Sequence, residues 1–141
     1  MAMNLTYYLN FNGNCEDALN FYKQALNGEI KGLQTFGQSP MPSAEEYKNR
    51  ILHAELHFGN NMIMASDTMP DRPGTEGTNF SLSLNFTDTK EEETIYHRLS
   101  DGGEITLPLQ DTFWGARFGM IKDKFGISWM FNCLLPGQQS M

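Results

Sequence analysis

The sequence lacks the features that mark nucleic-acid-binding, membrane-spanning and secreted proteins. Its 141 residues carry 10 Lys and Arg against 17 Asp and Glu, which gives a formal net charge of -7. Affinity for nucleic acids and for anionic lipid depends on clustered positive charge, so neither is expected as a partner. No apolar run approaches the roughly 20 residues of a membrane span. The first residues lack the basic and apolar regions of a secretory signal, which favours a cytoplasmic location.

Cysteine is also scarce. Cys15 and Cys133 are the two cysteines, and a pair so far apart in the sequence does not indicate a disulfide framework. Free thiols are the expectation for a cytoplasmic protein. The sequence shows no nucleophile–base pair and no glycine-rich turn of the Gly-x-Gly-x-x-Gly kind for a nucleotide-like cofactor. We therefore expect no organic cofactor, and a divalent metal is left open.

The most informative feature that is present is an internal repeat with a constant offset of 75 residues and no gap. Leu9–Phe11 recurs as Leu84–Phe86, and both segments read Leu-Asn-Phe. Gly28–Ile30 recurs as Gly103–Ile105, and both read Gly-Glu-Ile. Since self-similarity at a fixed offset is typical of repeated structural units, the chain is predicted to contain two copies of one module.

Each copy is predicted to contain a strand, a helix and three further strands. In the first copy a strand is expected over Tyr7–Phe11, followed by a helix that starts at an Asn14 cap and stops at Gly28. In the second copy Thr89 and Glu92 have the spacing of a capping box. The class is therefore α+β, with two tandem βαβββ modules. The strand candidates after the two helices are 29–36, 51–58 and 62–66, then 104–109, 116–121 and 127–133.

The organisation expected from this pattern is one domain over 1–141. It comprises module 1 over about 4–67, a linker rich in Pro, Gly and Thr over about 68–79, and module 2 over about 80–134. Two sheets with one helix each on the outer face are expected to form a curved eight-stranded mixed sheet with an open cleft. Alternate strand residues would line that cleft, and open clefts of this kind are common sites for small ligands.

Five segments, spread over nearly the whole chain, together resemble one protein family. They are Tyr8–Tyr22, His53–Leu56, Met64–Asp67, Asp111–Gly115 and Asp123–Trp129. These segments and the paired βαβββ modules are similar to the PhnB-like branch of the glyoxalase/bleomycin-resistance, or vicinal oxygen chelate, superfamily. The resemblance implies the glyoxalase/bleomycin resistance/dioxygenase fold. Proteins of this branch often carry the label 3-demethylubiquinone-9 3-methyltransferase, but the missing glycine-rich turn argues against methyl transfer here.

The resemblance also implies where a metal would be held. Enzymes of the superfamily bind a divalent metal through His, Gln and Glu from the first and last strands of each module, and the ion polarises two vicinal oxygens of the substrate. Because Leu, Ile and Met do not bind a hard cation, this sequence departs from the metalloenzyme pattern at most or all four positions. By spacing, those positions fall at or beside Tyr7, at Leu82 or Ser81, at Met130, and near Ile63 or Met64.

A different set of candidate ligands lies on one predicted strand. His53, Glu55 and His57 alternate along this strand, so their side chains project to the same face. Two imidazoles and a carboxylate could bind zinc, although neighbouring ligands on a flat strand diverge more than a tetrahedral site needs. The alternative is an exposed polar face. The resemblance makes His53 the most interesting of the three, either as a ligand-binding or acid–base residue near neutral pH or as a structural histidine.

Four further residues are candidates for ligand contacts, each with a structural alternative. Asp67 ends a predicted strand, where it either caps the following turn or points into the cleft. Phe113 and Trp114 lie close to Arg117. Stacking on the indole and a bidentate contact from the guanidinium would hold an aromatic or anionic ligand. Otherwise Trp114 seals the edge of the core and Arg117 is solvated.

These observations leave two main hypotheses about function. The first is a protein that binds a small molecule in the cleft without the superfamily's usual metal site, as bleomycin-resistance proteins of the same superfamily do. The second is a metal-dependent lyase, isomerase or dioxygenase that uses His53 with non-standard ligands. A module for dimer contacts alone is a third and weaker idea. The resemblance also implies a homodimer.

Overall fold

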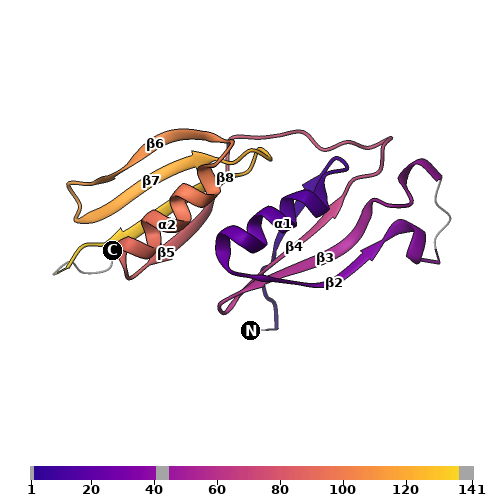
Figure 1. Cartoon of the computed structure of the whole chain (residues 1–141), viewed down its shortest axis with the longest axis horizontal. Helices are drawn as coiled ribbons and strands as arrows, with labels where there is room; N and C mark the ends of the chain where they lie inside the picture. The colour runs from indigo at the N-terminus through magenta and orange to yellow at the C-terminus, as the bar shows by residue number, and fades with distance from the viewer. Residues whose placement is uncertain (1, 41–44, 137–141) are drawn as a thin grey trace. The chain divides into compact units, whose positions relative to one another are not determined.

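The computed structural model describes residues 2–40 and 45–136. The chain divides into two compact units, module 1 over Met1–Thr75 and module 2 over Glu76–Met141. Within the described residues, each module has four strands and one α-helix, in the order strand, helix and three strands (Figure 1). The predicted α+β class and the two βαβββ modules are therefore confirmed.

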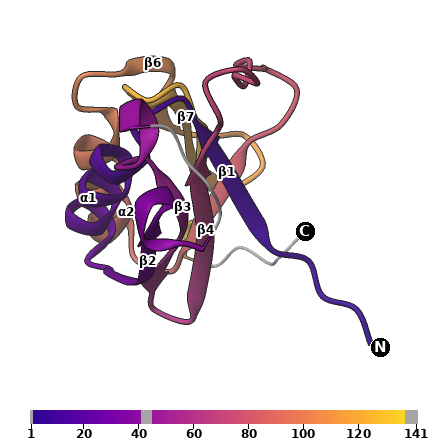
Figure 2. The same ribbon diagram turned by 90° about the vertical axis from the view of Figure 1, so that its right-hand side faces the viewer.

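Module 1 is a mixed four-stranded sheet with one helix against one of its faces. The strand order is β1-β4-β3-β2, in which β1 and β4 are parallel and the other neighbours are antiparallel. Figure 2 shows α1 on one side of the sheet, and it is the one α-helix among the described residues of this module. The elements are β1 (Tyr7–Phe11), α1 (Cys15–Leu26), β2 (Glu29–Thr35), the 3₁₀ turns Phe36–Gln38 and Glu45–Tyr47, β3 (Ile51–Phe58) and β4 (Asn61–Asp67).

Module 2 repeats this topology with the order β5-β8-β7-β6 and the same parallel and antiparallel pairs. The predicted strands are all present, and their ends differ by no more than two residues, as when β6 continues to Asp111. The elements are β5 (Leu82–Phe86), α2 (Thr89–Ser100), β6 (Glu104–Asp111), β7 (Ala116–Lys122) and β8 (Ser128–Leu134).

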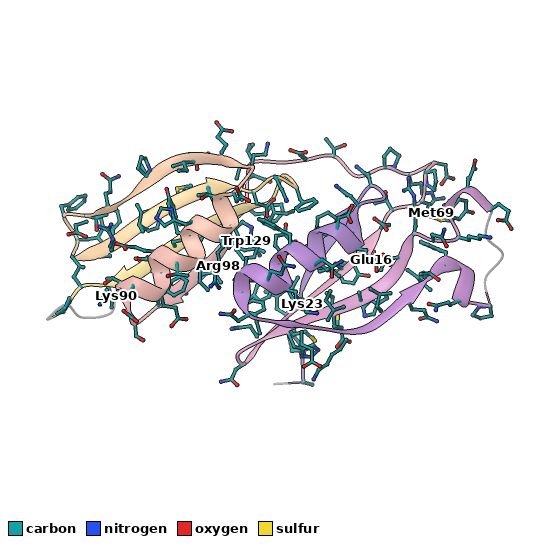
Figure 3. All side chains as sticks on the ribbon, in the orientation of Figure 1. Glu16, Lys23, Met69, Lys90, Arg98 and Trp129 are labelled. Atoms are coloured by element: carbon teal, nitrogen blue, oxygen red, sulfur yellow. The ribbon has the colours of Figure 1, made fainter. Side chains whose placement is uncertain are left out.

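The core of each module lies between its helix and its sheet. The helices are amphipathic, and their apolar residues recur at helical spacing, so one stripe of each helix is buried on the strands. Acidic residues in the first turn and basic residues in the last turn favour each helix through its dipole. Glu16 and Lys23 mark those two turns of α1 in Figure 3. Module 1 buries Leu9, Phe11, Leu19, Tyr22, Leu56 and Ile63, and module 2 buries Ile95, Leu99, Ile121, Trp129 and Phe131.

The start of α1 is held by Asp67 and not by the predicted cap. Asn14 occupies the N-cap position, but its side chain makes no capping hydrogen bond. The buried carboxylate of Asp67, at the end of β4, accepts hydrogen bonds from the backbone N–H groups of Gly13 at 2.8 Å and Cys15 at 3.0 Å. Its other oxygen accepts from the N–H of Ile51 at 2.8 Å. One side chain therefore joins the helix start to the beginning of β3 and the end of β4.

The start of α2 also differs from the prediction. The N-cap is Asp88, whose side chain accepts a hydrogen bond from the backbone N–H of Lys90 at 3.0 Å. Thr89 is the first helical residue, so Thr89 and Glu92 do not form the capping box that their spacing suggested. Glu92 instead faces the sheet and is fully buried. The capping box was a false signal because Asp88, one position earlier, is an equally good cap.

The repeated glycines after the helices are explained by a close approach of two backbones. Asn27 takes the left-handed conformation that ends α1, with φ of 54°, so Gly28 is not the left-handed residue of this helix end. A Cβ at Gly28 would lie 2.8 Å from the carbonyl oxygen of His57. A Cβ at Gly103, its repeat partner, would overlap the carbonyl oxygen of Lys122. In both modules, glycine lets the chain entering the second strand pass close to the third strand.

Part of the predicted linker is attached to module 1. The side-chain oxygen of Asn12 accepts hydrogen bonds from the hydroxyl of Thr68 at 2.7 Å and from the backbone N–H of Gly74 at 2.8 Å. Nη1 of Arg50 donates to the carbonyl oxygen of Thr68 at 2.9 Å. These contacts keep 68–74 with module 1, in agreement with a division after Thr75. In the described part of the chain, no helix has the length and apolar character needed to cross a membrane.

We predict that Asp67→Asn destabilises the protein by about 3 kcal/mol, because the amide NH₂ cannot accept a hydrogen bond and leaves a buried backbone N–H without a partner. Urea unfolding followed by circular dichroism measures the change. Asp71→Asn is the matched control, since Asp71 is exposed in the following loop. Equal unfolding midpoints for the two variants would show that Asp67 does not have this role.

Candidate functional site

The face of the module 1 sheet that points away from α1 carries most of the candidate residues. Successive strand residues point to opposite faces. Since Ala54, Leu56 and Ile63 are buried on the α1 side, their neighbours in β3 and β4 point to the other side. We call this the open face of module 1. It comprises Tyr8, Asn10, Lys31, His53, Glu55, His57, Met62, Met64 and Ser66.

Four side chains on the open face form a continuous array. Nε2 of His57 lies 2.8 Å from Oε1 of Glu55, which is a hydrogen bond. Nε2 of His53 lies 3.8 Å from Oε2 of the same carboxylate, within the range of an ion pair. On its other side, Nδ1 of His53 is 3.3 Å from the hydroxyl oxygen of Tyr8. The array therefore runs from β1 to β3, passing over β4.

The carboxylate of Glu55 is the charged centre of this array. The hydrogen bond from His57 is the main cause that lowers the pKa of Glu55, and the charges of His57 and His53 act in the same direction. Burial of the carboxylate acts in the opposite direction and raises the pKa of Glu55. The side chains of His53, Glu55 and His57 are 36%, 30% and 34% exposed, so all three are accessible to a solute.

Tyr8 is the member of the array that the sequence interpretation missed. The sequence predicted a metal position at or beside Tyr7 and no ligand contact from Tyr8, but in the parallel β1–β4 pair Tyr8 lies opposite Met64, which in turn lies opposite Glu55. The alternation of the strand contained the signal, since Leu9 and Phe11 are buried on the α1 side and Tyr8 must point away from it. Met62 lies opposite His57, so two thioethers lie between the polar side chains.

The superfamily's metal positions carry poor ligands for a hard cation. On the faces away from the helices, Tyr8 pairs with Met64, and in module 2 Ser83 pairs with Met130. Ser83 is the repeat partner of Tyr8, while the predicted Leu82 pairs with the buried Trp129. Thioethers suit soft metals, so this set does not fit a hard divalent ion. Over residues 2–40 and 45–136, no group of three or more His, Cys, Asp and Glu side chains is arranged to hold a metal ion.

The structure does not bring Arg117 and Trp114 to one surface. Arg117 lies opposite the buried Cys133, on the side that α2 covers, and its Nη2 forms an ion pair with Glu93 of α2 at 3.1 Å. Its Nη1 donates to Asp111 at 3.2 Å. The ring of Trp114 packs edge-on against Phe118, with 5.8 Å between centroids, and Phe118 points to the other side of the sheet. The two side chains therefore do not face one ligand together, as the sequence had suggested for the Trp114 indole and the Arg117 guanidinium.

The remaining candidates have clear surroundings. Phe113 is 97% exposed and packs edge-on against Trp114, with 5.0 Å between ring centroids. Asp67 uses both carboxylate oxygens for the backbone contacts described above and accepts nothing from the following turn. Cys15 and Cys133 are buried free thiols, and burial raises the pKa of Cys15 to about 12. A thiol that holds its proton at neutral pH is a poor nucleophile.

Module 2 contains a buried carboxyl group that the sequence did not reveal as unusual. Glu92 is fully buried under α2, and neither of its oxygens has a hydrogen-bond partner among the described residues. The buried Nε of Arg117 also lacks one. Burial raises the pKa of Glu92 to about 7, and the nearby charge of Arg117 offsets part of that increase. The group is therefore near its titration point at neutral pH.

The paired βαβββ modules have the fold found in glyoxalase/bleomycin-resistance/dioxygenase proteins. A protein of that description from Nocardioides has the same fold, with a TM-score of 0.57 and 18% identity over 100% of this chain and 90% of that one. At this identity the likeness concerns the fold alone.

The chain belongs to the family described as 3-demethylubiquinone-9 3-methyltransferase, whose model matches residues 3–131. It is 33% identical to Protein YjdN of Escherichia coli over 92% of this chain and 95% of that protein. A crystal structure of a Pseudomonas aeruginosa protein is 41% identical, with a TM-score of 0.87 and coverage of 95% and 99%. A putative 3-demethylubiquinone-9 3-methyltransferase, PhnB protein, from Bacillus cereus is 26% identical, with a TM-score of 0.78 and coverage of 93% and 99%. The PhnB-like branch is thereby confirmed.

Because the pKa of Glu92 is raised in the folded state, this residue favours folding at low pH, and the contribution is lost as pH rises from about 4.5 through about 7. We predict that Glu92→Gln becomes more stable relative to the wild type over that interval, by at most about 3 kcal/mol. Urea unfolding at pH 5 and pH 8 measures the change. Glu91→Gln, an exposed neighbour, should show no such dependence. A pH-independent difference for Glu92→Gln would contradict the prediction.

Proposed function

We propose that the protein binds a small molecule on the open face of module 1, with His53 as the central polar contact and without the superfamily's usual metal site. The observation that carries this proposal is the array of Tyr8, His53, Glu55 and His57, which lies half exposed on the side of the sheet away from α1. Small-molecule sites typically combine an apolar surface with a few polar groups that fix the orientation of the ligand.

The surroundings of the array support the same proposal. Met62 and Met64 place adaptable apolar surface directly beside the polar groups, and methionine side chains adjust readily to varied ligand shapes. We assign Asp67 and Arg117 to the stability of their modules, because their polar groups are engaged by other parts of the protein.

The second candidate function is a metal-dependent lyase, isomerase or dioxygenase that uses His53 with Glu55 and His57. The observation in its favour is that two imidazole nitrogens approach one carboxylate. Against it, His57 and Glu55 form a hydrogen bond with each other, so both would have to turn before an ion could bind. The name of the family suggests methyl transfer, but neither helix follows a glycine-rich turn suited to a nucleotide-like methyl donor.

The test of binding is a thermal-shift screen of a few hundred small acidic, basic and neutral molecules. Hits are then titrated into protein with ¹³C-labelled methionine methyl groups. We expect hits to shift the methyl signals of Met62 and Met64. We expect His53→Ala to lower the affinity for these hits at least about ten-fold, or about 1.4 kcal/mol. His97→Ala is the matched control, because His97 lies exposed on α2. Hits that bind equally well to both variants would contradict a site at His53.

The test of the metal hypothesis is the metal content of tag-free protein, dialysed without chelator and measured by mass spectrometry. We expect far less than one zinc, nickel, manganese or iron per chain, since the donor set does not fit a hard ion. His53→Ala is measured in parallel. Near one metal per chain in the wild type, lost in His53→Ala, would replace the binding proposal with the metal-dependent one. Substrate screens should then favour molecules with two vicinal oxygens.

A further inference from the structure

We propose that the open face of module 1 selects organic cations, such as primary ammonium compounds, over carboxylate and phosphate anions. This inference rests on the proposed function, since it names the class of ligand for the same site. The hydrogen-bond directions within the array carry the argument, because they decide whether the array offers donors or acceptors to a bound molecule.

The direction of the first hydrogen bond follows from Glu55. An ionised carboxylate can only accept hydrogen bonds, so Nε2 of His57 must carry the proton that lies between them at 2.8 Å. In the neutral imidazole, Nδ1 of His57 then has no hydrogen and acts as an acceptor. A carboxylate partner fixes the tautomer of a histidine in this way.

The same reasoning assigns the other half of the array. Nε2 of His53 is the nitrogen nearer to Glu55, at 3.8 Å, and a proton there interacts favourably with the carboxylate. Nδ1 of His53 is then the acceptor, and the Tyr8 hydroxyl donates its hydrogen to it across 3.3 Å. The Tyr8 oxygen keeps its lone pairs, and this side chain is 43% exposed. In these tautomers, the groups of the array left for a ligand are Nδ1 of His57, the Tyr8 oxygen and the Glu55 carboxylate, and all of them are acceptors.

The charges around the array favour a cation as well. On β2, Lys31 lies opposite Glu55 and Glu29 lies opposite His57, and both are exposed. One positive and one negative charge leave the carboxylate of Glu55 uncompensated. The ring of Tyr8 adds a surface that attracts cations. The net charge of -7 for the whole chain acts in the same direction at longer range.

An anion would meet the opposite conditions. It would lie close to the carboxylate of Glu55, and like charges at short range repel. It would also need hydrogen-bond donors from the array, whereas the N–H of His57 is donated to Glu55 and the O–H of Tyr8 is directed to His53. The ammonium group of Lys31 lies on the neighbouring strand, opposite Glu55 itself. A cationic head group instead fits the free acceptors, while its apolar part rests on Met62 and Met64.

The experiment compares three fragments with the same ring, namely benzylamine, benzyl alcohol and benzoate. Each is titrated at pH 8 into protein with ¹³C-labelled methionine methyl groups, and the shifts of Met62 and Met64 are followed. We expect benzylamine to bind at least about ten-fold more tightly than benzoate, with benzyl alcohol between them. Glu55→Gln should remove the preference. Glu16→Gln, which deletes the same charge from exposed α1 sequence, should keep it.

The possible failures can be told apart. Benzoate binding as tightly as benzylamine would overturn the cation preference and leave the proposed site in place. If no fragment shifts Met62 or Met64, the proposed site fails, and the preference fails with it. Long-range ¹⁵N–¹H spectra of the wild-type histidines give an independent check that needs no variant. A proton on Nδ1 of His53 at pH 8, in place of Nε2, would overturn the assignment of acceptors.

Discussion

Each sheet of this protein has one helix of its own module, and that helix lies on one face of the sheet. Because strand side chains alternate between faces, alternate residues of the inner strands are buried against α1 or α2, and the residues between them point away from the helix. The residues on the helix side are the apolar core. The residues on the other side are free to carry polar chemistry, and in module 1 they include Tyr8, His53, Glu55 and His57. The candidate site is thus a direct consequence of a βαβββ module with a single helix.

The two modules share a topology but stabilise their helices by different means. In module 1 the last strand supplies Asp67, which lies opposite Phe11 and binds the start of α1. The matching position of module 2, opposite Phe86, is Cys133, which cannot replace a carboxylate as an acceptor. There α2 supplies its own cap, Asp88. Duplication therefore fixed the arrangement of the strands, while the contacts at the helix starts diverged.

The family relationship and the site geometry answer different questions. The family model and the relatives establish the branch and the fold, whereas the arrangement of side chains at the candidate site bears on what the protein binds. On the faces away from the helices, Tyr8 pairs with Met64 in module 1, and Ser83 pairs with Met130 in module 2. The thioethers of the two methionines suit soft metals and not hard divalent ions.

The sequence by itself determined the two modules, because the offset of 75 residues and the strand and helix periodicities are local signals that do not depend on packing. It also placed His53, Glu55 and His57 on one face, since alternation along a strand is a property of the backbone. Only the tertiary structure decided which side chains meet across strands. Each of the following depends on residues of different elements. Tyr8 contacts His53, Asp67 accepts hydrogen bonds from the start of α1, and Glu92 is buried against the sheet. Their register is set by packing and is not visible in any single segment of the chain.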